Sequence, residues 1–261
     1  AGKELNSSEK IVIKATGGGA FKFANLFMEK LGISLEQVDE VDSLVAGADF
    51  ALKAWHREAF TYMNGEKEYI LLDPQNLYPY LLVNIGTGVS ITKVDSENTS
   101  QLVSGSSIGG GTFVGLGKLL TKCKSFNELL EQSHQGNTRA IDMLVEDIYG
   151  ELEYSKLRFP RNALACSFGQ AIHQNKELED YRSEDIALSL LRMISYNIAQ
   201  LAFMNAVLYG VKRIFFGGSF IHSNEYAMVK ISEGIHDWSG GEAKATFLSH
   251  EGVLGALGAF L

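Results

Sequence analysis

The chain has 261 residues, of which 46% are hydrophobic and 21% charged, so it can bury a sizeable core and fits one large or two small domains. Its formal net charge is -8 and its 23 lysines and arginines are scattered, which argues against nucleic-acid binding through a clustered basic face. Two isolated cysteines, Cys123 and Cys166, are too few for a disulfide framework or a zinc site and predict reduced thiols.

The start of the chain, AGKELNSSEK, is polar and lacks the apolar core of a signal peptide. No apolar run reaches the ~18 residues that a membrane span needs. These features predict a cytoplasmic, globular protein without a membrane-spanning segment.

The first elements are expected to be a strand and a helix. EKIVIKATGGGAF predicts a strand that ends on a glycine turn at residues 17–19, with a helix over about residues 21–30, where three apolar residues follow helical spacing. Ser34 and Gln37 have the spacing of a capping box, which predicts that an acidic helical segment opens there. Residues 53–79 are expected to form an irregular, aromatic-rich insertion with weak strand signals.

Residues 81–113 carry the most informative pattern. LLVNIGTGVS is a strand that turns on Gly86 and Gly88, and the chain returns through ITKVDSENTSQLVSGSSIGGGTF into a helix. Glycines let backbone N–H groups point into such a turn where a Cβ would clash, and Thr87 and Ser90 add hydroxyl donors. The pattern favours a phosphate-binding hairpin, although an ordinary type I′ or II′ hairpin also needs such glycines.

A second glycine loop strengthens the phosphate interpretation. Gly109, Gly110 and Gly111 stand where the chain enters the next helix, and the N-terminal end of a helix favours anions. Repetition of a loop rich in glycine, serine and threonine is less expected of a purely structural turn.

Three helices are expected after the hairpin. Ser125 and Glu128 form a second predicted capping box. Asn137 is expected to cap an amphipathic helix over residues 140–148. The longest helix is predicted over residues 183–209, and its apolar residues cover more than one face, which indicates burial against its own sheet and against a second subunit.

The end of the chain alternates strands with glycine turns. VKRIFFGGSF predicts a buried strand that ends on Gly217 and Gly218, and ATFLSHEGVLGALGAFL predicts a strand, a turn and a small-residue helix. Alternating strands and helices predict an α/β fold with ligands at the carboxyl ends of the strands. Neither a P-loop, since Gly117-Lys118 is followed by Leu119, nor a G-x-G-x-x-G motif at the first helix is present.

Six runs resemble, in order and spacing, the eukaryotic type II pantothenate kinases: ATGGGAFKF, PYLLVNIGTGVSI, GSSIGGGTFVGLGKLLT, DMLVEDIYG, ACSFG and FLSHEGVLGALGAFL. The resemblance covers nearly the whole chain. It implies the two-lobe architecture of the actin-like, ribonuclease H-like ATPases with a truncated N-terminal lobe. Residues 1–79 would be the remainder of the N-terminal lobe, and residues 80–261 the C-terminal lobe.

The resemblance also implies a function. Members of the family phosphorylate pantothenate with ATP and Mg²⁺, the first step of coenzyme A synthesis, and acyl-CoA inhibits them by occupying the same cleft. They dimerise through long helices, which here implies a homodimer through residues 183–209, or a heterodimer with an active kinase.

The substrate side of the site follows from the matching motifs. Thr87 and Ser90 match two hydroxyl positions that bind pantothenate or acyl-CoA, and Ala165 in ACSFG matches an alanine of the acyl-CoA channel. Leu102 stands where the family has an arginine that would hold the carboxylate of pantothenate. Lys93 or another basic group is an alternative source of that positive charge if the local alignment shifts.

The nucleotide side consists of glycines. The resemblance assigns the adenosine to the glycine pair at residues 217–218, which follows the strand near the end of the chain. It assigns the phosphates to the two earlier glycine loops, at residues 86–88 and 109–111. The nucleotide-binding residues expected are Gly86, Gly88, Gly109, Gly110, Gly111, Gly217 and Gly218.

No catalytic residue is expected within this chain. Family members carry a D-x-G-G-[ST]-x-x-K hairpin and a catalytic glutamate upstream of TGGGA, and the chain starts too late to contain them. One alternative is a kinase whose N-terminal part lies elsewhere. The other is a catalytically dead member that binds CoA or acyl-CoA or regulates an active partner kinase, which Leu102 favours. A sugar or acetate kinase of the same superfamily fits less well.

The remaining acidic and histidine residues predict no metal site. Asp95 and Glu97 are expected to be solvated turn residues, and His250 and Glu251 in SHEG to lie at a helix start in a capping role. The other five histidines have no common context. Without the upstream strands, the strand at residues 11–14 is expected to expose an edge or an apolar face.

Overall fold

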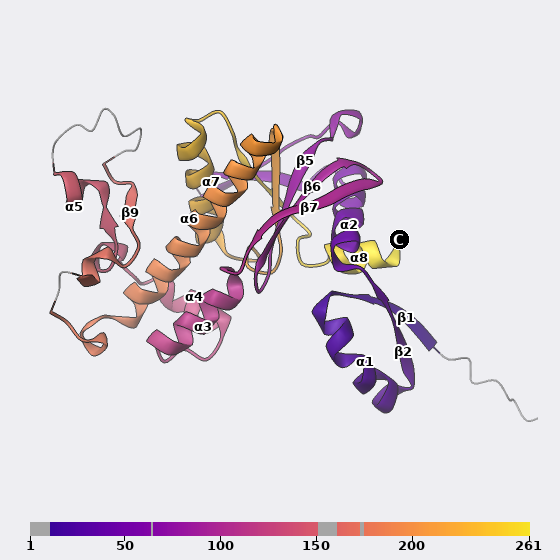
Figure 1. The fold of residues 1–261 in the computed structure, drawn as a ribbon, viewed down its shortest axis with the longest axis horizontal. Helices are drawn as coiled ribbons and strands as arrows, with labels where there is room; N and C mark the ends of the chain where they lie inside the picture. The colour runs from indigo at the N-terminus through magenta and orange to yellow at the C-terminus, as the bar shows by residue number, and fades with distance from the viewer. Residues whose placement is uncertain (1–10, 64, 151–160, 173–174) are drawn as a thin grey trace, which may run out of the picture.

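The computed structural model describes residues 11–63, 65–150, 161–172 and 175–261 (Figure 1). The helices and strands, in chain order, are β1 (Ile11–Thr16), α1 (Gly17–Leu31), β2 (Ile33–Val38), α2 (Glu40–Ala54), β3 (Ala59–Met63), β4 (Glu66–Tyr69), β5 (Tyr80–Ile85), β6 (Val89–Ser96), β7 (Thr99–Ser106), α3 (Gly110–Leu120), α4 (Phe126–Ser133), β8 (Met143–Leu144), α5 (Val145–Tyr149), β9 (Leu164–Cys166), α6 (Ser183–Tyr209), β10 (Arg213–Gly217), α7 (Glu225–Ser239), β11 (Ala245–Leu248) and α8 (Leu254–Phe260). The expected α/β class is confirmed.

A seven-stranded sheet in the order β4-β3-β11-β10-β5-β6-β7 forms the centre of the molecule. Strands β10 and β11 run parallel to β5, while β6 and β7 continue from β5 as the expected antiparallel hairpin. Because β5, β10 and β11 are parallel, their carboxyl ends lie at one edge of the sheet, where α/β proteins bind ligands.

Helices cover both faces of the sheet (Figure 1). Alternate residues of β5 enter two different cores: Leu81 packs on the side of α3, α6 and α7, whereas Leu82 packs on the side of α2 and α8. Apart from Asn84, the residues of β5 are therefore hydrophobic, as expected for a strand buried on both faces.

The longest helix is confirmed. α6 (Ser183–Tyr209) ends at Gly210, which has φ 64° and caps the helix with its backbone N–H. Among the described residues, α6 alone is long and apolar enough to cross a bilayer, but 56% of its most apolar window is buried inside the protein. That burial is typical of a core helix.

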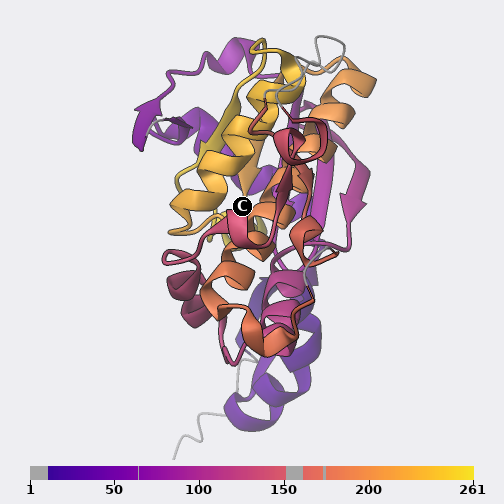
Figure 2. The same ribbon diagram turned by 90° about the vertical axis from the view of Figure 1, so that its left-hand side faces the viewer.

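β1, α1 and β2 form a unit at one end of the molecule in both views (Figures 1 and 2). β1 and β2 pair in parallel, and the strand at Ile11 exposes its apolar side chains as expected. The glycine turn expected at residues 17–19 is wrong, because these residues form the first turn of α1. Gly17 has φ 80°, and this single left-handed position makes the strand-to-helix transition.

Two further expectations are wrong because non-local pairing overrides the local signal. Ser34 and Gln37 lie within β2, where pairing with β1 extends the chain, and Asp39 instead caps α2 by accepting from the N–H groups of Val41 and Asp42. The helix expected over residues 140–148 is interrupted by strand β8, which pairs with β9.

Asn137 does cap, but it caps the short 3-10 turn Thr138–Ala140 through the N–H of Arg139. Only α5 (Val145–Tyr149) is α-helical in the segment where a longer helix was expected. The capping role of Ser125 is confirmed, since its Oγ accepts from the N–H of Glu128 at the start of α4.

Residues 53–79 are more regular than expected. β3 pairs with β11, and β4 pairs with β3, so both strands extend the central sheet. The sheet therefore includes strands on both sides of residue 79, the position where a division between lobes was expected.

Candidate functional site

Three glycine loops meet at the carboxyl ends of β5 and β10, and together they are called the glycine cluster here. They are the β5–β6 turn (residues 86–88), the entry to α3 (residues 109–111), and Gly217 with Gly218 at the end of β10. The sequence predicted each loop, and the tertiary structure brings all three together.

Backbone hydrogen bonds hold the first two loops against each other. The N–H of Gly110 donates to the carbonyl oxygen of Gly86, and the N–H of Gly111 donates to that of Thr87, both at 2.9 Å. These two N–H groups are therefore occupied within the protein. The N–H groups of Thr87 and Gly88 donate to no acceptor among the described residues, which leaves them available to a ligand.

Close backbone approach explains why these positions are glycines. A Cβ at Gly110 would lie 2.7 Å from the carbonyl oxygen of Gly86, and one at Gly109 would lie 2.8 Å from that of Thr87. Gly218 has φ 100°, and its Cβ would lie 2.5 Å from the carbonyl oxygen of Ile85. No other residue fits without moving the backbone.

An aromatic cluster supports the loops from the α6 side of the sheet. The rings of Phe113, Phe126 and Phe220 pack edge to face, with centroids 5.6 to 6.1 Å apart. The N–H of Phe220 also donates to the carbonyl oxygen of Ile85 at 3.0 Å, which ties the end of β10 to that of β5. The glycine cluster thus rests on a rigid base.

The expected substrate residues Ser90 and Leu102 lie on one face of the sheet. Leu102 pairs with Thr92, and Thr92 pairs with Leu82, whose side chain packs towards α2 and α8. Ser90 is two residues from Thr92 on the same strand, so it projects from that face as well. The side chain of Leu102 is exposed there (53%).

Lys93 projects from the other face. It pairs with Leu81, which belongs to the core on the side of α6, and its Nζ lies 2.6 Å from Oδ1 of Asp95. Lys93 is therefore not a substitute for a cation at Leu102. Thr87 lies exposed in the turn, where its methyl group would be 2.6 Å from a Cβ at Gly111.

Ala165 lies apart from the glycine cluster. It stands exposed on β9 and lines a cavity of about 490 Å³ with α5 residues including Tyr149, and with Tyr196 and Trp238. None of the residues that line this cavity belongs to the three glycine loops. A single chain therefore does not place Ala165 beside Thr87.

A cavity of about 470 Å³ opens beyond the ends of β10 and β11 and is called the β10–β11 cavity here. Gly217 borders this region, since a Cβ there would lie 3.5 Å from the Cβ of Glu251. The residues that line the cavity are Phe60, Lys67, Tyr69, His134, Ile221, His222, Ser223, Glu225, Met228, Leu248, Ser249 and Glu251.

The capping role expected of His250 and Glu251 is wrong, because α8 begins only at Leu254 and no side chain caps it. Nδ1 of His250 instead lies 2.5 Å from Oε2 of the buried Glu58, whose Oε1 also accepts from the N–H of His250. Burial raises the pKa of Glu58, and the hydrogen bonds from His250 oppose that shift. Sequence spacing gave no signal for this pair, 192 residues apart.

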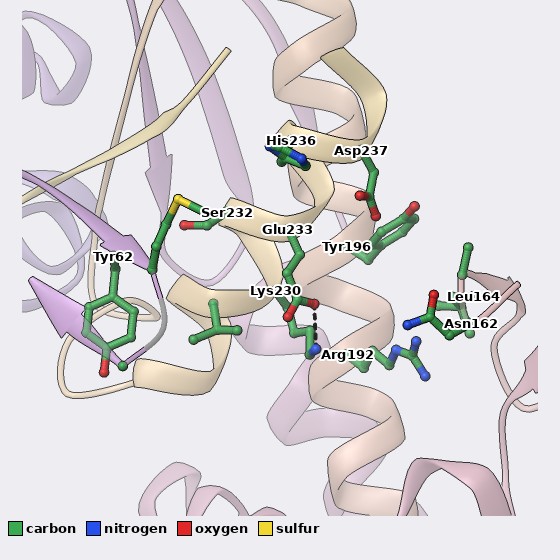
Figure 3. A pocket seen from close by; sticks show the side chains of 14 residues that line it. Tyr62, Asn162, Leu164, Arg192, Tyr196, Lys230, Ser232, Glu233, His236 and Asp237 are labelled. Carbon is green, nitrogen blue, oxygen red and sulfur yellow. Dashed lines mark hydrogen bonds and ion pairs between the residues drawn. The ribbon is translucent and has the colours of Figure 1, made fainter. Parts of the chain in front are cut away.

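A third cavity, of about 440 Å³, lies between α6 and α7 (Figure 3). Lys230 and Glu233 form an ion pair of 2.5 Å along α7, and Arg192 extends from α6 towards Asn162. Burial raises the pKa of Asp237 in the same cavity. This cavity contains no residue of the glycine cluster.

The acidic residues at the hairpin tip form ion pairs. Asp95 pairs with Lys93, and Glu97 Oε2 lies 3.4 Å from Nζ of Lys53. Within the described part of the chain, no group of three histidine, cysteine or acidic side chains could hold a metal ion.

Comparison with known proteins agrees with the resemblance found in the sequence. The family model described as Fumble, that of the type II pantothenate kinases, matches residues 2–261. The chain is 63% identical over 252 residues to pantothenate kinase 1 of Arabidopsis thaliana, a match that covers 97% of this chain and 66% of the relative. It is 62% identical to pantothenate kinase 2 of the same organism, a match that covers 96% of this chain and 28% of the relative. The chain therefore spans less than two thirds of the length of these relatives.

Other matches are more distant. The 4'-phosphopantetheine phosphatase of Mus musculus is 47% identical, over 98% of this chain and 31% of the relative. Among solved structures, a xylulose kinase from Lactobacillus acidophilus has a TM-score of 0.43 at 13% identity, covering 90% of this chain and 44% of that one.

Proposed function

Because this chain belongs to the Fumble family of type II pantothenate kinases, we propose that the protein containing it transfers a phosphoryl group from ATP to pantothenate and so begins coenzyme A synthesis. The observation that carries the proposal is the glycine cluster at the carboxyl ends of β5 and β10, held by the bond from Gly110 to Gly86. Such a cluster offers backbone N–H groups to phosphate without any bulky side chain.

The nucleotide would lie along this edge of the sheet. The free N–H groups of Thr87 and Gly88 would bind the phosphates, and the positive end of the α3 helix dipole would favour their charge nearby. Gly217 and Gly218 would pack against the adenosine. Mg²⁺, when bound with ATP, would neutralise phosphate charge, and its ligands would be mainly phosphate oxygens and water, because the described residues offer no metal cage.

Pantothenate, or the acyl-CoA inhibitor, would lie on the face that carries Ser90 and Leu102, with Thr87 at its end. Hydroxyl groups at Thr87 and Ser90 would bond its amide and hydroxyl groups. Leu102 offers no charge to a carboxylate. We assign no catalytic base to this chain.

A second function is favoured by Leu102 together with the opposite orientation of Lys93. A member with leucine at position 102 would bind CoA or acyl-CoA without phosphorylating pantothenate, or would regulate an active partner kinase. One relative bears the name of a phosphatase, so the family includes proteins named for other reactions.

We also propose a cytoplasmic homodimer through α6. The free thiols Cys123 and Cys166 support a reducing compartment. The exposed apolar residues Val207 and Leu208 near the end of α6 support a partner on that helix. A second copy would also explain how Ala165 could approach a ligand that lies far from it within one chain.

The test uses the full-length protein in thermal-shift titrations with ATP, acetyl-CoA and NAD, followed by a pantothenate phosphorylation assay. ATP and acetyl-CoA should each stabilise the protein, by about 2.7 kcal/mol at a concentration 100 times the dissociation constant. Phosphorylation supports the kinase, and stabilisation by acetyl-CoA without phosphorylation supports the second function. A shift with NAD alone would overturn both.

A further inference from the structure

One side-chain pair at the β10–β11 cavity belongs neither to the glycine cluster nor to the hydrophobic core. Nδ1 of His222 lies 2.9 Å from Oε1 of Glu251, across the two segments that follow β10 and β11. The His222 side chain is 71% exposed, whereas the Glu251 side chain is 9% exposed. A nearly buried carboxylate therefore fixes an imidazole that faces solvent and lines the cavity.

The pair determines which nitrogen of His222 carries a proton. An ionised carboxylate can only accept a hydrogen bond, so the proton lies on Nδ1 and points at Glu251. In the neutral ring, Nε2 is then a hydrogen-bond acceptor and the one ring nitrogen left for a ligand.

The sheet geometry indicates which part of a nucleotide reaches this position. The strands follow the order β5, β10, β11, with neighbouring strands about 4.8 Å apart. Phosphates held at the β5–β6 turn would therefore lie about 10 Å from the end of β11. Gly217, at the end of the strand between them, adds no side chain of its own, and the side chain of Glu251 packs directly against it, since a Cβ at Gly217 would lie 3.5 Å from the Cβ of Glu251.

The walls of the cavity suit a base better than a phosphate. Phe60, Tyr69 and Met228 supply apolar surface, whereas Glu225 and Glu251 offset the charge of Lys67. Tyr69 and His134 are the remaining titratable side chains in the wall. A flat heterocycle gains from aromatic surface, while an anion would meet two carboxylates.

We propose that His222, oriented by Glu251, reads the nucleobase and selects adenine over guanine. Adenine presents an exocyclic amino group, a donor that Nε2 accepts, whereas guanine presents a carbonyl oxygen at the corresponding position and meets a second acceptor. This role rests on the proposed function, because it assumes that a nucleotide occupies this edge.

The test is the ratio of the ATP and GTP dissociation constants, measured by calorimetry on the full-length protein and its variants. The wild-type protein should prefer ATP by about tenfold or more, the discrimination expected from one hydrogen bond gained against one acceptor clash. H222A should bring the ratio close to one. E251Q should lower it as well, because glutamine also donates and no longer fixes the ring tautomer.

H134A is the matched control, since it removes a histidine from the same cavity without touching the pair. It should alter both affinities alike and keep their ratio. Nitrogen-15 NMR of His222 should show an unprotonated Nε2 in the wild-type protein and lose that signature in E251Q.

The outcomes distinguish the base-reading role of His222 from the proposed nucleotide site. If the wild-type protein binds ATP and GTP equally, or H222A keeps the preference, the role of His222 is overturned and the nucleotide site stands. If the wild-type protein binds neither nucleotide, the proposed function is overturned and the base-reading role with it.

Discussion

Lys93 and Leu102 project from opposite faces of the same sheet, although they lie on neighbouring strands. Lys93 pairs with Gln101, the residue directly before Leu102, and side chains alternate along a strand. A one-residue offset therefore decides that the face carrying Ser90 has no charge from Lys93.

The first prediction follows from that arrangement. L102R in the full-length protein should tighten pantothenate binding about tenfold to hundredfold, because one charge-assisted hydrogen bond contributes roughly 1.5 to 3 kcal/mol. Calorimetry with pantothenate measures the change, and L102M is the control without charge. Equal affinities for L102R and L102M would show that this position does not contact the carboxylate.

The second prediction concerns the contact between two glycine loops. G110A should cost about 1 to 3 kcal/mol of unfolding free energy and weaken ATP binding, because its Cβ would lie 2.7 Å from the carbonyl oxygen of Gly86. Chemical denaturation measures the loss. G115A, in the same helix with nothing within 4 Å of its Cβ, is the control and should gain about 0.5 to 1 kcal/mol. A stable G110A that binds ATP normally would contradict the role of this contact.

The third prediction concerns the crossing of α2 and α8. A Cβ at Gly258 would lie 1.8 Å from the carbonyl oxygen of Ser43, so G258A must separate the two helices and should cost about 3 kcal/mol or more. G18A in α1, where the Cβ meets nothing within 4 Å, provides the comparison. Thermal unfolding of both variants distinguishes a packing effect from a helix-propensity effect, since only G258A should lower the melting temperature.

The fourth prediction is a pH dependence. The folded pKa of Glu58 is raised, mainly by burial, so this carboxyl group holds its proton more tightly in the folded protein than in the unfolded chain. Its contribution to stability is complete below the unfolded value of about 4.5 and declines as the pH rises through the folded pKa. Relative to E58Q, the wild-type protein should therefore lose stability as the pH rises from about 4 towards neutrality.

Removing the partner of Glu58 should accentuate this dependence. In H250A the hydrogen bonds that lower the pKa of Glu58 are reduced, so the decline should extend to higher pH. Denaturation at several pH values measures both differences. A difference in unfolding free energy between wild type and E58Q that stays constant with pH would contradict the raised pKa of Glu58.

The fifth prediction tests the proposed dimer. L208D should weaken self-association by about tenfold to hundredfold, because Leu208 is 73% exposed near the end of α6 and burying a leucine contributes about 1.5 to 3 kcal/mol. Analytical ultracentrifugation measures the dissociation constant. L71D places the same charge on an equally exposed leucine outside α6 and should leave association unchanged. A monomeric wild-type protein would reject the dimer.

The sequence by itself determined the elements whose signals are local. The glycine turn at residues 86–88, the capping of α4 by Ser125, and the length of α6 up to Gly210 all follow from propensity, capping and apolar spacing within a few residues. These elements form as predicted because no distant strand competes for their backbone hydrogen bonds.

Only the tertiary structure decided the features that depend on distant partners. Ser34 became part of a strand because β1 pairs with it, and residues 140–148 lost most of their predicted helix because β8 pairs with β9. The partners of His222 and His250 are acidic residues 29 and 192 positions away, which no spacing rule relates. Backbone pairing and buried charge follow from proximity in space, and the order of strands in the sheet sets that proximity.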